Sequence, residues 1–157
     1  MAASGILDVI VEQKGLIIDL HCTFLGASVD GIAIVNGEKV VLELRNPAAT
    51  WDMDILSAAN KLTCLKINEN NEICPNVKQS YYTQVQGQMG ILNISKCYVM
   101  LHVCTKSDIH IEIVSFDQYF YEKHLDKLTK FYNHFMLPEI VYPSVKFDLP
   151  ALDISKF

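Results

Sequence analysis

The feature that most restricts the fold is the dipeptide Asn36-Gly37, which lies between two runs rich in β-branched residues. Asn-Gly is the strongest short-range signal for a two-residue β-hairpin turn, because both residues tolerate positive φ. Such a turn pairs Val35 with Glu38 and fixes the register of every pair behind them. The sequence therefore predicts a tight hairpin with strands over 31–35 and 38–45.

Continued along both strands, this register places Asp30 directly opposite Glu43 on one face of the sheet. Arg45 lies two residues beyond Glu43 and so points to the same face, with Ser28 opposite it. Facing carboxylates repel each other unless a cation compensates, and hard oxygen ligands suit Mg²⁺ or Mn²⁺. A solvated ion-pair network explains the spacing at least as well, and a one-residue shift in register would separate the carboxylates.

The rest of the chain predicts a mixed α/β fold with a largely antiparallel central sheet flanked by helices. Helices are expected over 78–92 and 117–136, the second ended by Pro138. Further strands are expected over 8–12, 16–19, 24–29, 65–67, 72–74, 97–105 and 109–114, with the first two forming a hairpin around Lys14-Gly15. These elements predict one domain over residues 1–138, followed by an extended tail over 139–157.

The helix over 78–92 carries a polar face. Tyr81, Gln84 and Gln88 share that face at helical spacing, whereas Gln86 points nearly opposite. A glycine within a helix costs about 1 kcal/mol, so Gly87 suggests close packing against a sheet or a ligand. A polar helix face with an incidental glycine remains the alternative.

The composition limits the function classes. Among 157 residues, 13 are Lys or Arg and 18 are Asp or Glu, which gives a net charge of −5. This balance disfavours a broad basic surface for nucleic acid, but a site that grips phosphate through metal ions needs carboxylates. The sequence shows no membrane-length apolar run, no secretory signal and no Cys-x-x-Cys spacing. We expect an intracellular protein (nuclear if eukaryotic, otherwise cytoplasmic) with reduced thiols and no membrane partner.

Three segments of the sequence contain motifs that can be compared with known families: Phe24–Gly31, Val41–Pro47 and Tyr81–Gln88. In order and spacing they resemble the lambda-exonuclease-like, YqaJ-type viral recombinase family of the PD-(D/E)XK nuclease superfamily. That family shows Gly-x-Ser-x-Asp-Gly, then Glu-x-Lys-x-Pro, then Tyr-Tyr-x-Gln-x-Gln-x-Gln. The resemblance covers residues 8–136 and implies a restriction-endonuclease-like core.

The resemblance also implies an activity: Mg²⁺- or Mn²⁺-dependent exonucleolytic hydrolysis of linear duplex DNA from its ends, in recombination or mobile-element functions, often by ring-shaped homo-oligomers. It implies that Asp30 and Glu43 are metal ligands, with the Leu44 carbonyl completing the shell. It gives Gln84 the role of supporting the catalytic strand. The DNA contacts that it implies are Ser28, Tyr81 and Gln88.

Two departures from the family pattern matter. The family lysine is Arg45 in this chain, and arginine stays protonated, so it can stabilise phosphate charge but cannot act as a base. Few residues precede the first predicted strand, so we expect the family's N-terminal helix to be absent. Weakened activity is therefore expected, and a catalytically inactive nuclease fold that acts in DNA binding or protein assembly is the alternative.

Overall fold

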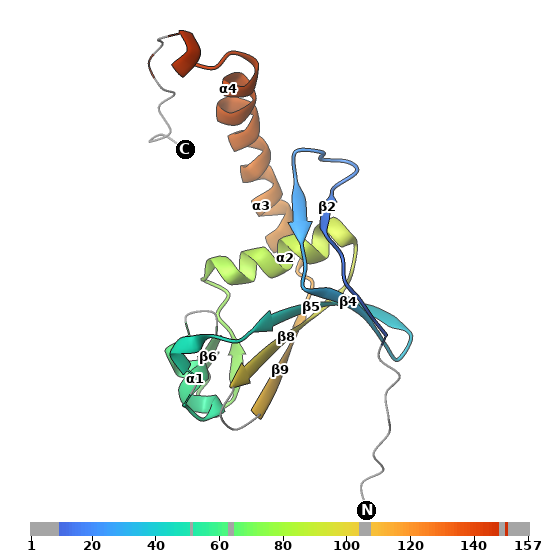
Figure 1. The fold of residues 1–157 in the computed structure, drawn as a ribbon, viewed down its shortest axis with the longest axis vertical. Coiled ribbons are helices and arrows are strands. Elements are labelled where there is room, and N and C mark those ends of the chain that lie inside the picture. The colour runs from blue at the N-terminus through green and yellow to red at the C-terminus, as the bar shows by residue number, and fades with distance from the viewer. Residues whose placement is uncertain (1–9, 51, 63–64, 104–107, 148–149, 151–157) are drawn as a thin grey trace, which may run out of the picture. The chain divides into compact units, whose positions relative to one another are not determined.

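The computed structural model describes residues 10–50, 52–62, 65–103, 108–147 and 150 (Figure 1). The chain divides into two compact units, Met1–Asp117 and Gln118–Phe157, which are described separately below. The sequence predicted the boundary after residue 138. The division falls earlier because the described residues from Gln118 onward contact mainly one another.

A five-stranded sheet forms the centre of the first unit. Its strands, in spatial order, are β1 (Ile10–Glu12), β4 (Gly31–Val35), β5 (Glu38–Arg45), β8 (Lys96–Val103) and β9 (Asp108–Ser115). Neighbouring strands are antiparallel except for β5 and β8, which are parallel. The predicted mixed, largely antiparallel sheet is therefore confirmed. Of the predicted strands, residues 8–9 and 104–105 lie outside the described residues.

The β4–β5 hairpin has the predicted turn and register. Asn36 and Gly37 have φ values of 52° and 81°, as a turn with two left-handed central residues requires. Val35 pairs with Glu38, and the same register continues to the pair of Gly31 and Leu42.

The first predicted hairpin is wrong. β1 pairs with β4, whereas β2 (Leu16–Ile18) pairs with β3 (Gly26–Ser28) in a separate two-stranded sheet. Alternation of apolar residues identifies a strand but not the strand with which it pairs.

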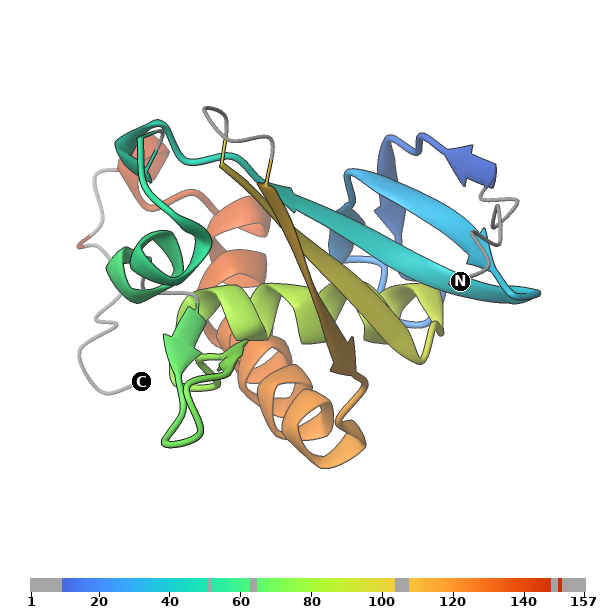
Figure 2. The same cartoon turned by 90° about the horizontal axis from the view of Figure 1, so that it is seen from below.

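β5 and β8 are parallel, so a crossover connection must join them. α2 (Ser80–Leu92) belongs to this connection and lies across one face of the sheet (Figure 2). The core between them includes Val41 of β5 and Val99 of β8, with Val85 and Met89 of α2, each no more than 2% exposed. A Cβ added at Gly87 would meet nothing within 4 Å, so this glycine is not needed for close packing. The helix ends at Asn93, which adopts a left-handed conformation with φ of 52°.

Gln86 of α2 points away from Gln84 and Gln88, as predicted. It is 1% exposed, donates a hydrogen bond to the Ser115 carbonyl at 2.9 Å, and accepts one from the Asp117 backbone N–H at 2.8 Å. This side chain therefore fixes α2 to the end of β9.

The remainder of the crossover contains η1 (Ala48–Thr50), α1 (Ile55–Lys61), β6 (Leu65–Ile67) and β7 (Ile73–Pro75). Asp54 caps α1 by accepting a hydrogen bond from the Ser57 backbone N–H at 2.9 Å. The predicted hairpin is confirmed, because β6 and β7 pair antiparallel. Among the described cysteines, Cys22, Cys74 and Cys97 are free, and Cys97 is fully buried.

The second unit begins with α3 (Gln118–Phe131), followed by the π-helix η2 (Tyr132–Met136), α4 (Leu137–Val141) and η3 (Val145–Phe147). The predicted end at Pro138 is wrong, because this proline occupies the first turn of α4, where no backbone N–H is needed. Residues 148–149 and 151–157 of the predicted extended tail lie outside the described residues. Within the described residues, no helix is both long and apolar enough to cross a membrane.

Candidate active site

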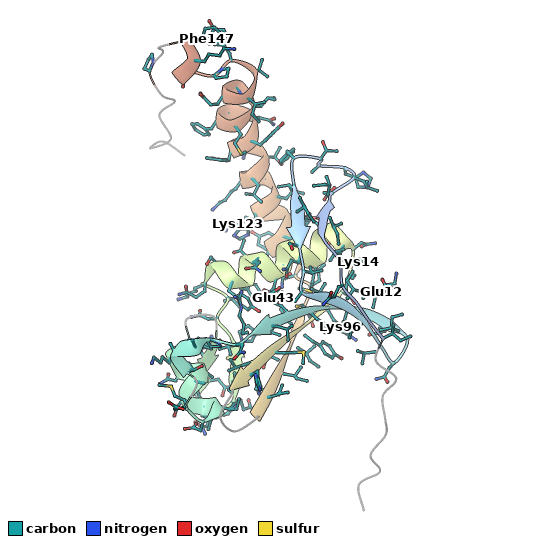
Figure 3. The ribbon with its side chains drawn as sticks, viewed as in Figure 1. Glu12, Lys14, Glu43, Lys96, Lys123 and Phe147 are labelled. Carbon is teal, nitrogen blue, oxygen red and sulfur yellow. The ribbon has the colours of Figure 1, made fainter. Side chains whose placement is uncertain are left out.

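The candidate site is built around the carboxylate of Glu43, which β5 directs toward α2 (Figure 3). Glu43 is 5% exposed, although a glutamate of ordinary pKa is charged at neutral pH and is rarely buried. Gln84 donates its side-chain amide to Oε1 at 2.9 Å, and Gln88 donates to Oε2 at 2.9 Å. The two glutamines are four residues apart on α2, so one helix face supplies both donors. The sequence prediction that Gln84 and Gln88 share a face is confirmed.

Arg45 is the cationic neighbour of this carboxylate. Its Nη2 atom lies 3.3 Å from Glu43 Oε1, and its Cζ atom lies 4.1 Å from the centre of the Tyr81 ring. Residues two apart on a strand share a face, which explains why β5 brings Arg45 to Glu43. Tyr81 is one helical turn before Gln84, so α2 also supplies the aromatic surface beneath the guanidinium.

Asp30 joins the site from the loop before β4. Its Oδ2 atom accepts a hydrogen bond from the Leu44 backbone N–H at 2.7 Å. The β4–β5 ladder stops at Gly31 and Leu42, so Asp30 lies just beyond the last pair rather than within it. The N–H and C=O of one strand residue point to the same edge, so the Leu44 carbonyl faces the side on which Asp30 lies.

Ser28 is not placed as the hairpin register predicted. It pairs with Leu16 in the β2–β3 sheet and not with Arg45, because β3 forms a ladder separate from β4. Its backbone carbonyl nevertheless belongs to the site, since it accepts a hydrogen bond from Gln88 Nε2 at 2.9 Å. Gln88 is 3% exposed, so its amide is engaged inside the protein.

Burial dominates the electrostatics of Glu43. Removal from water raises the pKa of its carboxyl, the Gln88 hydrogen bond opposes that rise, and the charge of Asp30 adds to it. Arg45 and Gln84 lower the pKa again without cancelling the effect. Asp30 and Glu43 are therefore close enough to repel each other, as expected of two groups that could share a cation.

Three buried polar atoms near this carboxylate have no hydrogen-bond partner among the described residues: Arg45 Nε, the Tyr81 hydroxyl and Gln88 Oε1. Burial raises the pKa of Tyr81 well above its ordinary value, so its hydroxyl stays protonated and can donate. Buried polar groups are normally paired, and each unpaired one calls for an explanation. These atoms beside Glu43 are therefore available to water or to a polar ligand.

A hard divalent cation fits the residues present. Asp30, Glu43 and the Leu44 carbonyl are oxygen donors of the kind that Mg²⁺ and Mn²⁺ prefer, and Gln88 Oε1 is a further unpaired oxygen nearby. Glu43 Oε1 already faces Gln84 and Arg45, so Oε2 keeps the greater capacity to accept. The described residues hold no cluster of three or more His, Cys, Asp or Glu, so a cation here depends on two carboxylates.

The candidate site thus lies on a mixed α/β fold, in which two acids of the sheet region lie beside a helix that supplies two glutamines. Two crystal structures have a similar fold: the alkaline exonuclease LHK-Exo from Laribacter hongkongensis, and LHK-Exo in complex with dAMP. Each is 20% identical to this chain, with a TM-score of 0.64, over 89% of this chain and 63% of the exonuclease chain. The chain thus spans less than two thirds of the length of these neighbours.

No family model and no curated protein matches the sequence. The likeness to LHK-Exo nevertheless confirms, at the level of the fold, the resemblance to the lambda-exonuclease-like proteins.

Sequence reasoning missed two contacts that shape the site. The hydrogen bond from the Leu44 N–H to Asp30 forms outside any ladder, so strand pairing could not predict it. The stacking of Arg45 on Tyr81 joins residues 36 positions apart on a strand and a helix. The helical spacing of Tyr81 and Gln84 was the one available signal for it.

Proposed function

We propose that this chain is a metal-dependent exonuclease that hydrolyses phosphodiester bonds at the ends of linear duplex DNA. The observation that carries the proposal is the buried Glu43 carboxylate, held by Gln84 and Gln88 beside Asp30 on a fold shared with an alkaline exonuclease. LHK-Exo has been crystallised with dAMP, a deoxynucleoside monophosphate of the kind that exonucleolytic cleavage releases. An enzyme of this type would act where the cell keeps its DNA, in recombination or mobile-element functions.

In this proposal Asp30, Glu43 and the Leu44 carbonyl hold Mg²⁺ or Mn²⁺. A bound cation of this kind supplies an activated water and stabilises the leaving oxygen. Gln84 and Gln88 keep the Glu43 carboxylate oriented, and Arg45 offers its guanidinium to the phosphate while Tyr81 supports it from below. Arg45 stays protonated throughout, so it takes no proton from water.

The net charge of the chain limits how tightly it would bind DNA. A net charge of −5 leaves few cations to neutralise phosphates, so we propose modest affinity with a shallow dependence on salt concentration. Ser28 remains a proposed DNA contact at the end of β3. Tyr81 and Gln88 act in this proposal through Arg45 and Glu43, because their polar atoms are buried.

A direct assay tests the proposal. Linear duplex labelled at its ends is incubated with excess protein and either Mg²⁺ or Mn²⁺, and nucleotide release is followed over time. We expect release by the natural chain and its loss in Glu43→Gln and Asp30→Asn. Absence of release from both the natural chain and Arg45→Lys would overturn the proposal.

A second function is favoured by one observation. The Arg45 guanidinium is 3.3 Å from Glu43 and stacked on Tyr81, so a permanent cation already neutralises the carboxylate. On this alternative the chain is a catalytically inactive nuclease fold that binds DNA or takes part in protein assembly. Metal-independent binding of a duplex end, with no release of nucleotide from any variant, would support it.

A further inference from the structure

One side of α3 combines cations with an exposed aromatic ring. Its members follow one another at spacings of four, four and three residues, so at about 100° per residue they lie within about 80° of one another around the helix. The three lysines are exposed, and the tyrosine is 77% exposed. We call this set the basic face of α3: Tyr119, Lys123, Lys127 and Lys130.

The apolar residues of α3 lie on another side of the helix. Tyr121, Leu125 and Leu128 also follow one another at spacings of four and three residues, but they are rotated by roughly 170° from the basic face. Tyr119 is therefore not part of the apolar stripe of this helix. An aromatic ring among lysines is the combination with which proteins bind single-stranded nucleic acid, through base stacking and phosphate contacts.

The acids of α3 leave most of the basic face available. Glu122 accepts a hydrogen bond at 2.6 Å from the glutamine four residues before it, and Asp126 pairs with Lys130 at 2.6 Å. Among the described residues, no carboxylate forms an ion pair with Lys123 or Lys127. The ammonium groups of these two lysines can therefore bind an anion from outside the fold.

We propose that the basic face of α3 binds the single strand of DNA that remains when an exonuclease removes the complementary strand. The source of that strand rests on the proposed function, whereas the binding itself does not. Lys123 and Lys127 contact phosphates, and Tyr119 stacks on a base. A single strand suits this face better than a duplex, because paired bases inside a duplex are stacked on one another and leave no free face for the ring. From Tyr119 to Lys130 the helix rises about 17 Å, so the contact covers a short stretch of strand.

The first test measures the charge dependence of binding. Fluorescence anisotropy of a labelled oligothymidylate is recorded with the full chain in EDTA, across a range of salt concentrations. Each phosphate contact with a single strand contributes about 0.7 to the slope of log affinity against log salt, so the slope should fall by about 1.4 in the double variant Lys123→Gln/Lys127→Gln. No binding by the natural chain, or an equal slope for the double variant, overturns the proposal.

The matched control for this test is the double variant Lys39→Gln/Lys66→Gln. It removes the same charge from two exposed lysines, one in β5 and one in β6, and it should leave the slope as it is in the natural chain. An equal fall of the slope in both double variants would show that net charge, and not the basic face, determines the binding, which also overturns the proposal.

The second test concerns Tyr119. Tyr119→Ala should weaken binding of the oligothymidylate at least about fivefold without changing the salt slope, because stacking on a base involves no counterion release. Tyr119→Phe keeps the ring and should bind as the natural chain does. A blunt dA·dT duplex of the same length should bind more weakly than the single strand. Unchanged affinity of Tyr119→Ala, or equal affinity for the duplex, contradicts the proposed contact.

Failure of this inference and failure of the proposed function give different results. Cleavage of an end-labelled duplex in Mn²⁺ depends on Asp30 and Glu43, whereas binding in EDTA depends on α3. A chain that cleaves DNA but keeps its salt slope in Lys123→Gln/Lys127→Gln would refute the inference alone. A chain that shows the expected slopes but releases no nucleotide, either as the natural chain or as Arg45→Lys, would refute the proposed function and support the basic face.

Discussion

The side-chain amide of Gln88 lies 2.9 Å from the carboxylate of Glu43, although 45 residues separate them in the sequence. The same amide nitrogen donates to the Ser28 carbonyl at 2.9 Å. One buried glutamine therefore joins β3, β5 and α2, and it fixes the orientation of the one fully enclosed acid of the site.

Replacing Gln88 by leucine should lower the free energy of unfolding by about 1–3 kcal/mol, because it leaves a buried carboxylate oxygen and a carbonyl without this donor. Urea unfolding monitored by circular dichroism measures the change. Gln79→Leu is the control, since Gln79 stands at the start of α2 and makes no side-chain capping bond. An equal loss of unfolding free energy in the two variants would show that the hydrogen bonds of Gln88 do not stabilise the fold.

The pKa of Glu43 predicts a pH dependence of stability. Burial raises this pKa above the ordinary value of 4.5, so the folded chain binds the proton more tightly than the unfolded chain does. The resulting stabilisation is complete below pH 4.5 and is lost as the pH rises through the folded value. The difference in unfolding free energy between the natural chain and Glu43→Gln should therefore fall as the pH rises from 4.5. A difference in unfolding free energy that does not change with pH for Glu43→Gln would contradict the argument.

Metal binding should depend on both acids of the site. The natural chain should bind Mn²⁺, and Asp30→Asn or Glu43→Gln should weaken that binding by at least about tenfold, because among the described residues the site offers a cation two carboxylates. Titration of Mn²⁺ followed by electron paramagnetic resonance measures the affinity. Asp54→Asn is the matched control, because asparagine also caps a helix and Asp54 lies at α1. Mn²⁺ binding that survives both site substitutions would place the cation elsewhere.

Arg45→Lys should raise the rate of nucleotide release by roughly 100-fold, because lysine is smaller and its pKa can shift, so it can help to activate water. The assay is single-turnover cleavage of a labelled duplex in Mg²⁺. Arg45→Met provides the comparison, since it keeps a long side chain without charge or water-activating nitrogen. If Arg45→Lys cleaves no faster than Arg45→Met, the difference between arginine and lysine is not what limits this site.

Local chemistry made the β4–β5 hairpin predictable. Asn36 and Gly37 specify the turn, and the turn alone fixes the register up to Gly31 and Leu42. Three residues further, the prediction for Ser28 was wrong, because the chain leaves one ladder and joins another between β3 and β4. A register propagates only as far as its ladder, and the sequence contains no signal for where the ladder ends.

The site shows the same division between local and distant causes. Helical spacing placed Gln84 and Gln88 on one face, and strand spacing placed Arg45 beside Glu43. The resemblance to a nuclease family, not spacing, indicated that these two faces meet. The pairing of β1 with β4 and the continuation of the helix past Pro138 were missed, because tertiary partners and a π-turn decide them.

The opposite faces of α2 have consequences for how the sequence can vary. Gln86 anchors the helix to the end of β9, while Gln84 and Gln88 reach the acid on β5. Each added residue turns a helix by about 100°, so a single insertion between Gln86 and Gln88 would swing one anchor away while the other stayed attached. Length changes should therefore be tolerated in the turns around this helix but not within this stretch of it.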